Sequence, residues 1–166
     1  MLTAYVALGA NLGEAHAALR QALSALDSAA HSHVIACSGI YKTPALDDDA
    51  VPMDPPSPDY LNAVLALETS LSAEDLLVFM QSIENAAGRQ RPYRLAPRTL
   101  DLDLLRFGSL RGDKPNLTLP HPRMMSRAFV LLPLAEIAPE QVTPAELAAV
   151  QGQRIERIGP LPAAKD

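Results

Sequence analysis

The sequence predicts an α+β fold in which an antiparallel sheet is flanked by helices. Short runs of apolar and β-forming residues alternate with two longer stretches of helical period. These segments follow one another as strand, helix, strand, strand, helix, strand. The last of them, 99–104, alternates strictly between apolar and polar residues, as a half-buried strand does.

The first part of the chain supplies a strand, a helix and a second strand. The apolar run 3–8 predicts the strand, and residues 9–13 predict a tight loop after it. Between residues 14 and about 29, leucines and alanines recur at helical spacing, which indicates an amphipathic helix. Residues 34–43 are rich in β-formers and predict the second strand, which Pro44 ends.

A long polar segment precedes the third strand. Residues 45–59 contain four prolines and five aspartates, which is typical of a loop and not of a core element. Long loops in compact domains are usually functional or disordered, and we favour a functional loop. Residues 60–69 predict the third strand, so the loop joins two neighbouring strands.

The second helix is expected to begin after Ser72, with Asp75 at a capping-box position, and to stop at Gly88. An arginine-rich loop then leads into the alternating strand, which Gly108 closes. Weaker elements are expected downstream: a short strand at 117–119, a helix over 125–134, a helix start at 143–144 and a frayed end.

This order of elements is the split βαβ pattern of a ferredoxin-like sheet. Right-handed crossovers would put both helices on one face of the sheet. The leucines of the alternating strand would meet those helices or line the opposite core. The length of 166 residues predicts a single domain spanning 1–166, poorly constrained after about residue 150.

Composition excludes several classes of protein. The chain is 48% hydrophobic and 20% charged, as globular proteins are, and its net charge of −5 argues against general nucleic-acid binding. No apolar stretch reaches the roughly 18 residues of a membrane span. A single cysteine, Cys37, excludes a disulfide framework and a zinc-ligand spacing. We therefore expect a cytoplasmic monomer with neither nucleic-acid nor membrane partners.

Two carboxylates mark the alternating strand as a metal site. Asp101 and Asp103 share one face, and Leu100, Leu102 and Leu104 share the other. Residues two apart on a strand lie about 7 Å apart at the backbone, so two carboxylates there can hold a hard cation. Magnesium suits them, because it accepts carboxylates and keeps positions for water and substrate phosphates. The alternative is a solvated strand face, which the apolar Leu105 on the same face disfavours.

An arginine cluster directly before this strand indicates an anion site. Four of the 14 basic residues, Arg89, Arg91, Arg94 and Arg98, fall within ten positions of an acidic protein. Arginines beside a metal pair are what phosphoryl transfer requires. The alternative is a solvated charged loop. His121, fixed between two prolines, is a candidate phosphate or ribose donor, although a lone histidine is usually structural.

Three further residues suit a flat ring. Tyr60 and Asn62 alternate on the strand that follows the long loop, and with Phe129 they would sandwich a ring and bind its polar edge. Aromatic residues on strands are more often part of the core, so this hypothesis is the weaker reading from the residues alone.

Together these stretches resemble the 6-hydroxymethyl-7,8-dihydropterin pyrophosphokinase family of folate biosynthesis. The resemblance covers residues 1 to about 140 in the family's order. It rests on PRTLDLD at 97–103, GANLG at 9–13, YKTP at 41–44, DYLNA at 59–63 and LPHPR at 119–123.

The resemblance implies an enzyme that moves the β,γ-diphosphate of ATP onto the hydroxymethyl group of the pterin and releases AMP. It implies two Mg²⁺ ions held by Asp101 and Asp103, with Arg89 and Arg98 acting on the transferred group. The implied pterin-binding residues are Thr43, Pro44, Leu46, Tyr60, Asn62 and Phe129. The implied ATP-binding residues are Gln81, Glu84, Arg89, Arg91, Arg98, Leu104, Thr118, His121 and Arg127. The loops at 44–59 and 85–97 would close over the substrates.

Two other classes of function remain open. A metal-dependent nucleotide phosphohydrolase would share the aspartate pair and release inorganic phosphate without a pterin. A non-catalytic nucleotide-binding module of ferredoxin-like shape would bind ATP without needing Tyr60, Asn62 and Phe129.

Overall fold

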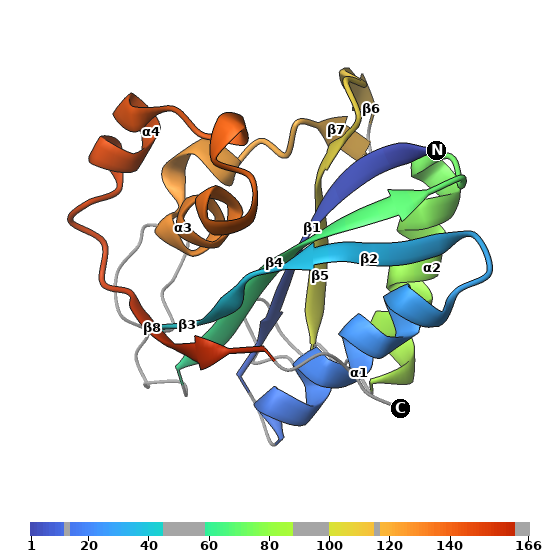
Figure 1. Ribbon diagram of the computed structural model, residues 1–166, viewed down its shortest axis with the longest axis horizontal. Helices are drawn as coiled ribbons and strands as arrows, with labels where there is room; N and C mark the ends of the chain where they lie inside the picture. Colours follow the sequence, from blue (N-terminus) through green and yellow to red (C-terminus); the bar gives the residue numbers. More distant parts are fainter. Residues whose placement is uncertain (12–13, 45–58, 88–99, 115–116, 162–166) are drawn as a thin grey trace.

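A computed structural model describes residues 1–11, 14–44, 59–87, 100–114 and 117–161, leaving aside the side chain of Met125. Figure 1 shows a sheet with α1 and α2 on one side and α3 and α4 on the other. The described elements are β1 (Leu2–Ala10), α1 (Ala15–Ser28), β2 (Ser32–Cys37), β3 (Gly39–Thr43), β4 (Tyr60–Thr69), α2 (Ala73–Ala86), β5 (Asp101–Phe107), β6 (Gly112–Lys114), β7 (Leu117–Leu119), α3 (Ala128–Ile137), α4 (Pro144–Ala149) and β8 (Glu156–Pro160).

The sheet has the strand order β5-β1-β4-β3-β8, and β2 also pairs with β4. Every pairing in it is antiparallel. If β2 and β3 count as one interrupted strand, the first four strands have the order of the split βαβ pattern. The predicted α+β class with an antiparallel sheet flanked by helices is confirmed.

The larger core lies between the sheet and the helices α1 and α2. Leu100, Leu102 and Leu104 point into it, as the alternation of β5 predicts. Leu19 and Leu26 of α1, among others, meet them from the helix side. Burying one such side chain contributes about 1.5–3 kcal/mol, so this face fixes how β5 is oriented and sends its aspartates to the opposite face.

A second core forms under α3 on the opposite face of the sheet. Val64 and Leu105 project from the sheet into it, and Leu131 and Leu134 meet them from the helix. The helix expected at 125–134 lies three residues later, because a 3₁₀ turn at Met124–Ser126 and an extended Arg127 precede it. Thr143 and Glu146 form the capping box that starts α4.

Two strand boundaries differ from the sequence prediction. The strand expected at 34–43 is interrupted at Ser38, whose hydroxyl oxygen accepts the Val64 N–H at 2.9 Å in place of a backbone partner. The sequence predicts a loop at residues 9 and 10, and this prediction is wrong, because β1 continues through Gly9 and Ala10. That extension places Gly9 in the sheet, between Asp101 of β5 and Asn62 of β4.

The C-terminal part of the chain differs most from expectation. Instead of a poorly constrained tail after residue 150, Glu156–Pro160 forms β8 and pairs with β3 at the edge of the sheet (Figure 1). Residues 162–166 lie outside the described part of the chain.

Within the described part of the chain, no helix is long and apolar enough to cross a membrane.

Candidate active site

A row of paired residues crosses the sheet on the face that α3 covers. Asp101 of β5 lies opposite Gly9 of β1, Gly9 lies opposite Asn62 of β4, and Asn62 lies opposite Tyr41 of β3. Neighbouring strands lie about 4.8 Å apart, so Asp101 and Asn62 are about 10 Å apart at the backbone, with Gly9 between them. Because glycine has no side chain, the row leaves room above β1, between Asp101 and Asn62.

The aspartate pair points to this face. Asp101 and Asp103 are both half-buried, and Leu105, the next residue on the face, is buried under α3. Among the described residues no group of three or more His, Cys, Asp and Glu is arranged to hold a metal ion. A carboxylate pair of this kind suits Mg²⁺, which takes one or two carboxylates and completes its shell with water and substrate phosphates.

His121, which the sequence offers as a candidate phosphate or ribose donor, lies beside the pair. Its backbone N–H donates to the Leu105 carbonyl at 2.9 Å, and its Nε2 is 3.7 Å from Oδ1 of Asp103. Its Nδ1 accepts the backbone N–H of Arg123 at 3.2 Å. In the neutral ring this leaves the proton on Nε2, on the side of Asp103. His121 is therefore placed to donate to an anion that approaches Asp103.

Glu84 anchors the strand that carries the aspartates. Glu84 is 4% exposed, and its Oε2 accepts the backbone N–H of Leu102, between the two aspartates, at 2.7 Å. Sequence reasoning missed this role. The signal for it was a carboxylate following Leu76 and Met80 at four-residue spacing, on the apolar face of α2. Its implied contact with ATP stays a prediction.

The Asn62 amide is held in one orientation. Nδ2 donates to the Tyr41 carbonyl at 3.1 Å and to Oγ1 of Thr43 at 2.9 Å. These bonds direct Oδ1 towards β1, where a Cβ added to Gly9 would lie 3.5 Å from Oδ1. Asn62 is 5% exposed, so the amide is a rigid acceptor next to Gly9 in the row.

Other predicted site residues gather less closely. Tyr60 pairs with Thr43 on the neighbouring strand, and Arg127 lies over the Phe129 ring with its guanidinium carbon 5.9 Å from the centroid. Leu104 is buried in the α1–α2 core, so any contact with ATP would go through its main chain. The remaining described residues are Pro44 at the end of β3, Gln81 exposed on α2 and Thr118 on β7. The other predicted residues, Leu46, Arg89, Arg91 and Arg98, lie outside the described residues.

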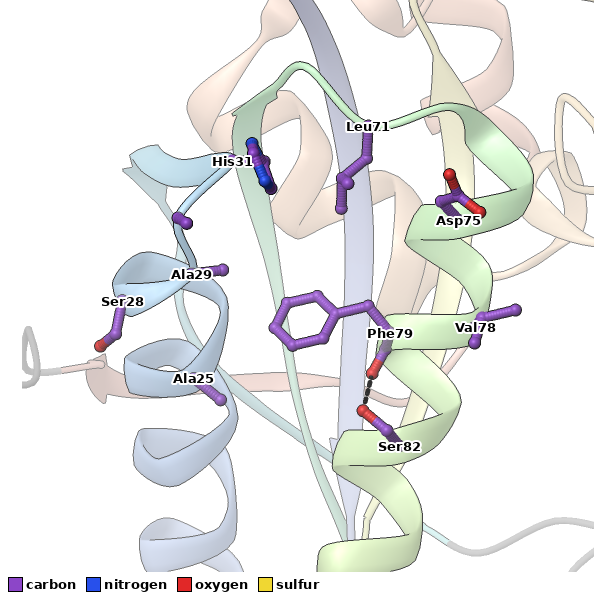
Figure 2. Close-up of a pocket in the computed structure, with 10 residues that line it drawn as sticks. Ala25, Ser28, Ala29, His31, Leu71, Asp75, Val78, Phe79 and Ser82 are labelled. Atoms are coloured by element: carbon purple, nitrogen blue, oxygen red, sulfur yellow. Dashed lines mark hydrogen bonds between the residues drawn. The ribbon is translucent and has the colours of Figure 1, made fainter.

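A hollow in the described structure lies away from this row. It lies between α1 and α2, has a volume of about 530 Å³, and has Leu71 and Phe79 pointing into it (Figure 2). Of its lining residues, His31 and Asp75 are the titratable ones. Its described lining has no arginine or lysine, the side chains that commonly bind phosphates. We therefore place the candidate site at the row and not in this hollow.

A carboxylate on α3 lies behind the Tyr41 end of the row. Glu136 accepts the Tyr41 hydroxyl at 2.6 Å and the backbone N–H of Gly39 at 3.1 Å. It also pairs with Arg157 of β8, whose Nη2 is 3.1 Å from Oε2. One carboxylate therefore connects α3, β3 and β8.

This contact shifts the acidity of both partners. Burial, together with the hydrogen bond to Glu136, raises the pKa of Tyr41 to about 12. Burial alone would raise the pKa of Glu136, but the hydrogen bonds from Arg157, Tyr41 and Gly39 outweigh it and lower that pKa below its ordinary value. Burial and the neighbouring Glu136 also raise the pKa of the Cys37 thiol to about 11.

The raised pKa of Tyr41 predicts a loss of stability in alkali. An unfolded tyrosine titrates near pH 10, below the folded value. The stabilisation is therefore complete below about pH 10 and is lost as the pH rises towards about 12. We expect Tyr41→Phe to lower Tm by the same amount between about pH 7 and 9, and by less above about pH 10. Thermal unfolding of both proteins measures this, and titration of Cys37 is common to both. A difference that stays constant to pH 11 would contradict it.

Comparison with known proteins gives this geometry a context. A family model described as 7,8-dihydro-6-hydroxymethylpterin-pyrophosphokinase (HPPK) matches residues 5–139. A Pseudomonas aeruginosa protein named 2-amino-4-hydroxy-6-hydroxymethyldihydropteridine pyrophosphokinase is 42% identical over 160 residues, covering 93% of this chain and 95% of its own. A Haemophilus influenzae protein of the same name is 44% identical over 144 residues, covering 87% and 86%.

Solved structures support the fold. The wild-type HPPK-DHPS crystal structure from Plasmodium falciparum aligns with a TM-score of 0.61 at 16% identity. The alignment covers 84% of this chain and 41% of that one, so this chain spans about two fifths of the solved chain. The row across the sheet lies within the residues that the family model matches, and β8 lies beyond them.

Proposed function

The chain belongs to the 7,8-dihydro-6-hydroxymethylpterin-pyrophosphokinase family, and on that premise we propose that its reaction takes place over the row Asp101–Gly9–Asn62. The enzyme transfers the β,γ-diphosphate of ATP to 6-hydroxymethyl-7,8-dihydropterin, a step in folate biosynthesis. The hydroxymethyl oxygen forms a bond to the β-phosphorus and loses its proton. The bond from that phosphorus to the oxygen on the α-phosphorus breaks, and AMP leaves with that oxygen.

One observation carries the proposal: an aspartate pair and a fixed amide face the same side of the sheet with a glycine between them. The pterin is a flat ring with N–H donors along one edge. Oδ1 of Asn62 is an acceptor for that edge. Thr43 of β3 bonds to the same amide, and Pro44 follows Thr43 in the chain. In the proposal Tyr60 and Phe129 stack on the ring, and Leu46 completes the slot.

At the other end of the row, Asp101 and Asp103 hold Mg²⁺, in the proposal two ions. The donor set fits, because the two carboxylates are hard ligands and are partly exposed. An ion held by them would keep coordination positions for phosphate oxygens. Bound there, Mg²⁺ would neutralise charge on the diphosphate in transit. His121 would donate its Nε2–H to a phosphate oxygen beside Asp103.

The proposed ATP-binding set extends from this end of the row. Arg89 and Arg98 bear on the transferred group, where negative charge spreads over the non-bridging oxygens. The other proposed contacts are Gln81, Glu84, Arg91, Leu104, Thr118 and Arg127. We further propose that the protein is a cytoplasmic monomer whose only partners are its small-molecule substrates, ATP and 6-hydroxymethyl-7,8-dihydropterin.

The deciding experiment follows ATP with and without 6-hydroxymethyl-7,8-dihydropterin in the presence of Mg²⁺. We expect AMP to form only when the pterin is present, in equal amount to the pterin diphosphate. Inorganic phosphate released without pterin would instead identify a phosphohydrolase. ATP binding without turnover in either reaction would identify a binding module.

A further inference from the structure

The C-terminal strand β8 lies beyond the residues matched by the family model, yet it is built into the sheet next to the row. β8 lies alongside β3 at the edge of the sheet (Figure 1). Ile40 of β3 pairs with Gly159, and Tyr41 pairs with Arg157. The guanidinium group of Arg157 lies flat against Gly39, where a Cβ would overlap it. A glycine at position 39 therefore permits the contact.

Arg157 is linked to Asn62 through two residues. Its Nε and Nη2 donate to Glu136 at 3.3 and 3.1 Å. Glu136 accepts the Tyr41 hydroxyl at 2.6 Å, and the Tyr41 carbonyl accepts Nδ2 of Asn62 at 3.1 Å. Tyr41 is 7% exposed, and these two hydrogen bonds hold it at both its hydroxyl group and its backbone.

The arrangement constrains the direction of the Asn62 amide. Tyr41 and Thr43 supply the two acceptors for Nδ2, and both belong to β3. β3 is short, and Glu136 ties its first residue, Gly39, and its central tyrosine to α3. If β3 shifts, both acceptors shift, and Oδ1 turns away from the space above Gly9.

We propose that Arg157 and Glu136 are positioning residues for substrate recognition, and that they act through Tyr41 to hold the Asn62 amide in its pterin-binding orientation. The inference rests on the proposed function of Asn62. It adds a strand outside the family match to the determinants of pterin binding. Neither residue touches the substrate, so their effect falls on pterin affinity and not on the chemistry at the phosphates.

The test is the kinetics of Arg157→Ala. We expect the KM for pterin to rise about five- to tenfold, with kcat and the KM for ATP within about twofold of wild type. The effect is moderate because the lost charge-assisted hydrogen bond acts on Asn62 only through Glu136 and Tyr41. Arg157→Lys should recover part of the loss. Arg154→Ala, which removes an exposed arginine three residues earlier, should leave all three constants unchanged.

A double-mutant cycle separates positioning from general loosening of the fold. In an Asn62→Ala background, Arg157→Ala should no longer lower kcat/KM for pterin, because the amide that it orients is gone. An equal fall in both backgrounds would overturn the proposal, as would equal effects on the constants for pterin and ATP. Thermal unfolding checks that each variant is folded, and Glu136→Gln, which keeps the hydrogen-bonding shape, provides a second variant in the same direction.

The controls also separate this proposal from the function on which it rests. Absence of pterin-dependent AMP formation by the wild-type chain would remove the proposed function itself. An unchanged pterin KM for Asn62→Ala would remove the slot. If the wild-type chain forms AMP with pterin and Asn62→Ala raises the KM for pterin, but Arg157→Ala leaves that KM unchanged, only the positioning role fails.

Discussion

Replacing Asp103 with asparagine is expected to lower kcat by about a thousandfold, the larger end of the loss seen when a charge-stabilising group is removed from a transition state. The amide keeps the size of the side chain but removes the charge that suits Mg²⁺. Asp101→Asn should behave in the same way. The fold should survive both changes, because the strand is fixed by its leucine face and by the bond from Leu102 to Glu84.

The structure offers a matched control for this loss. Glu68 of β4 is also a half-exposed carboxylate on a strand, and it lies 3.4 Å from an imidazole, that of His33. Glu68→Gln should retain wild-type turnover. A second readout is the rise in Tm when Mg²⁺ and a non-hydrolysable ATP analogue are added together, which should be lost in the aspartate variants only. Near-wild-type turnover of either variant at saturating Mg²⁺ would remove the metal role.

The aspartate pair could be found from the sequence because its signal is local. Side chains alternate along any strand, so one face of 99–104 had to be leucine and the other aspartate. The leucines then had to be buried, which left Asp101 and Asp103 on the other face. The same local logic located α1, α2 and the cap of α4, since helix period and capping residues lie within a few positions of one another.

What could not be predicted depends on pairing between distant segments. The sequence predicts a loop at Gly9, because this glycine follows the apolar run 3–8, and only the pairing with Asn62 and Asp101 shows that it lies in the sheet. β8 was missed for a similar reason. Its residues are mostly exposed and have no apolar alternation, so its place is set by the free edge of β3 and by the Arg157–Glu136 pair.

The glycine in the row gives the second large effect. Gly9→Val should lower kcat/KM for the pterin about a hundredfold, because a branched side chain would fill the space between Asn62 and Asp101 and displace the substrates from their alignment. The fold should not suffer. Gly9 is in an ordinary strand conformation, where valine is preferred and glycine costs about 0.5–1 kcal/mol relative to alanine.

Activity and stability should therefore change in opposite directions, which a general disruption of the sheet would not produce. Gly9→Ala is the graded control: its Cβ would lie 3.5 Å from Oδ1 of Asn62, an ordinary contact, so the loss should stay below about tenfold. Gly112→Val, at a strand glycine with open space around it, should leave activity unchanged. If Gly9→Val keeps wild-type kcat/KM while Tm is unchanged or raised, the substrates do not meet above β1. The row would then be a structural feature of the sheet and not the place of transfer.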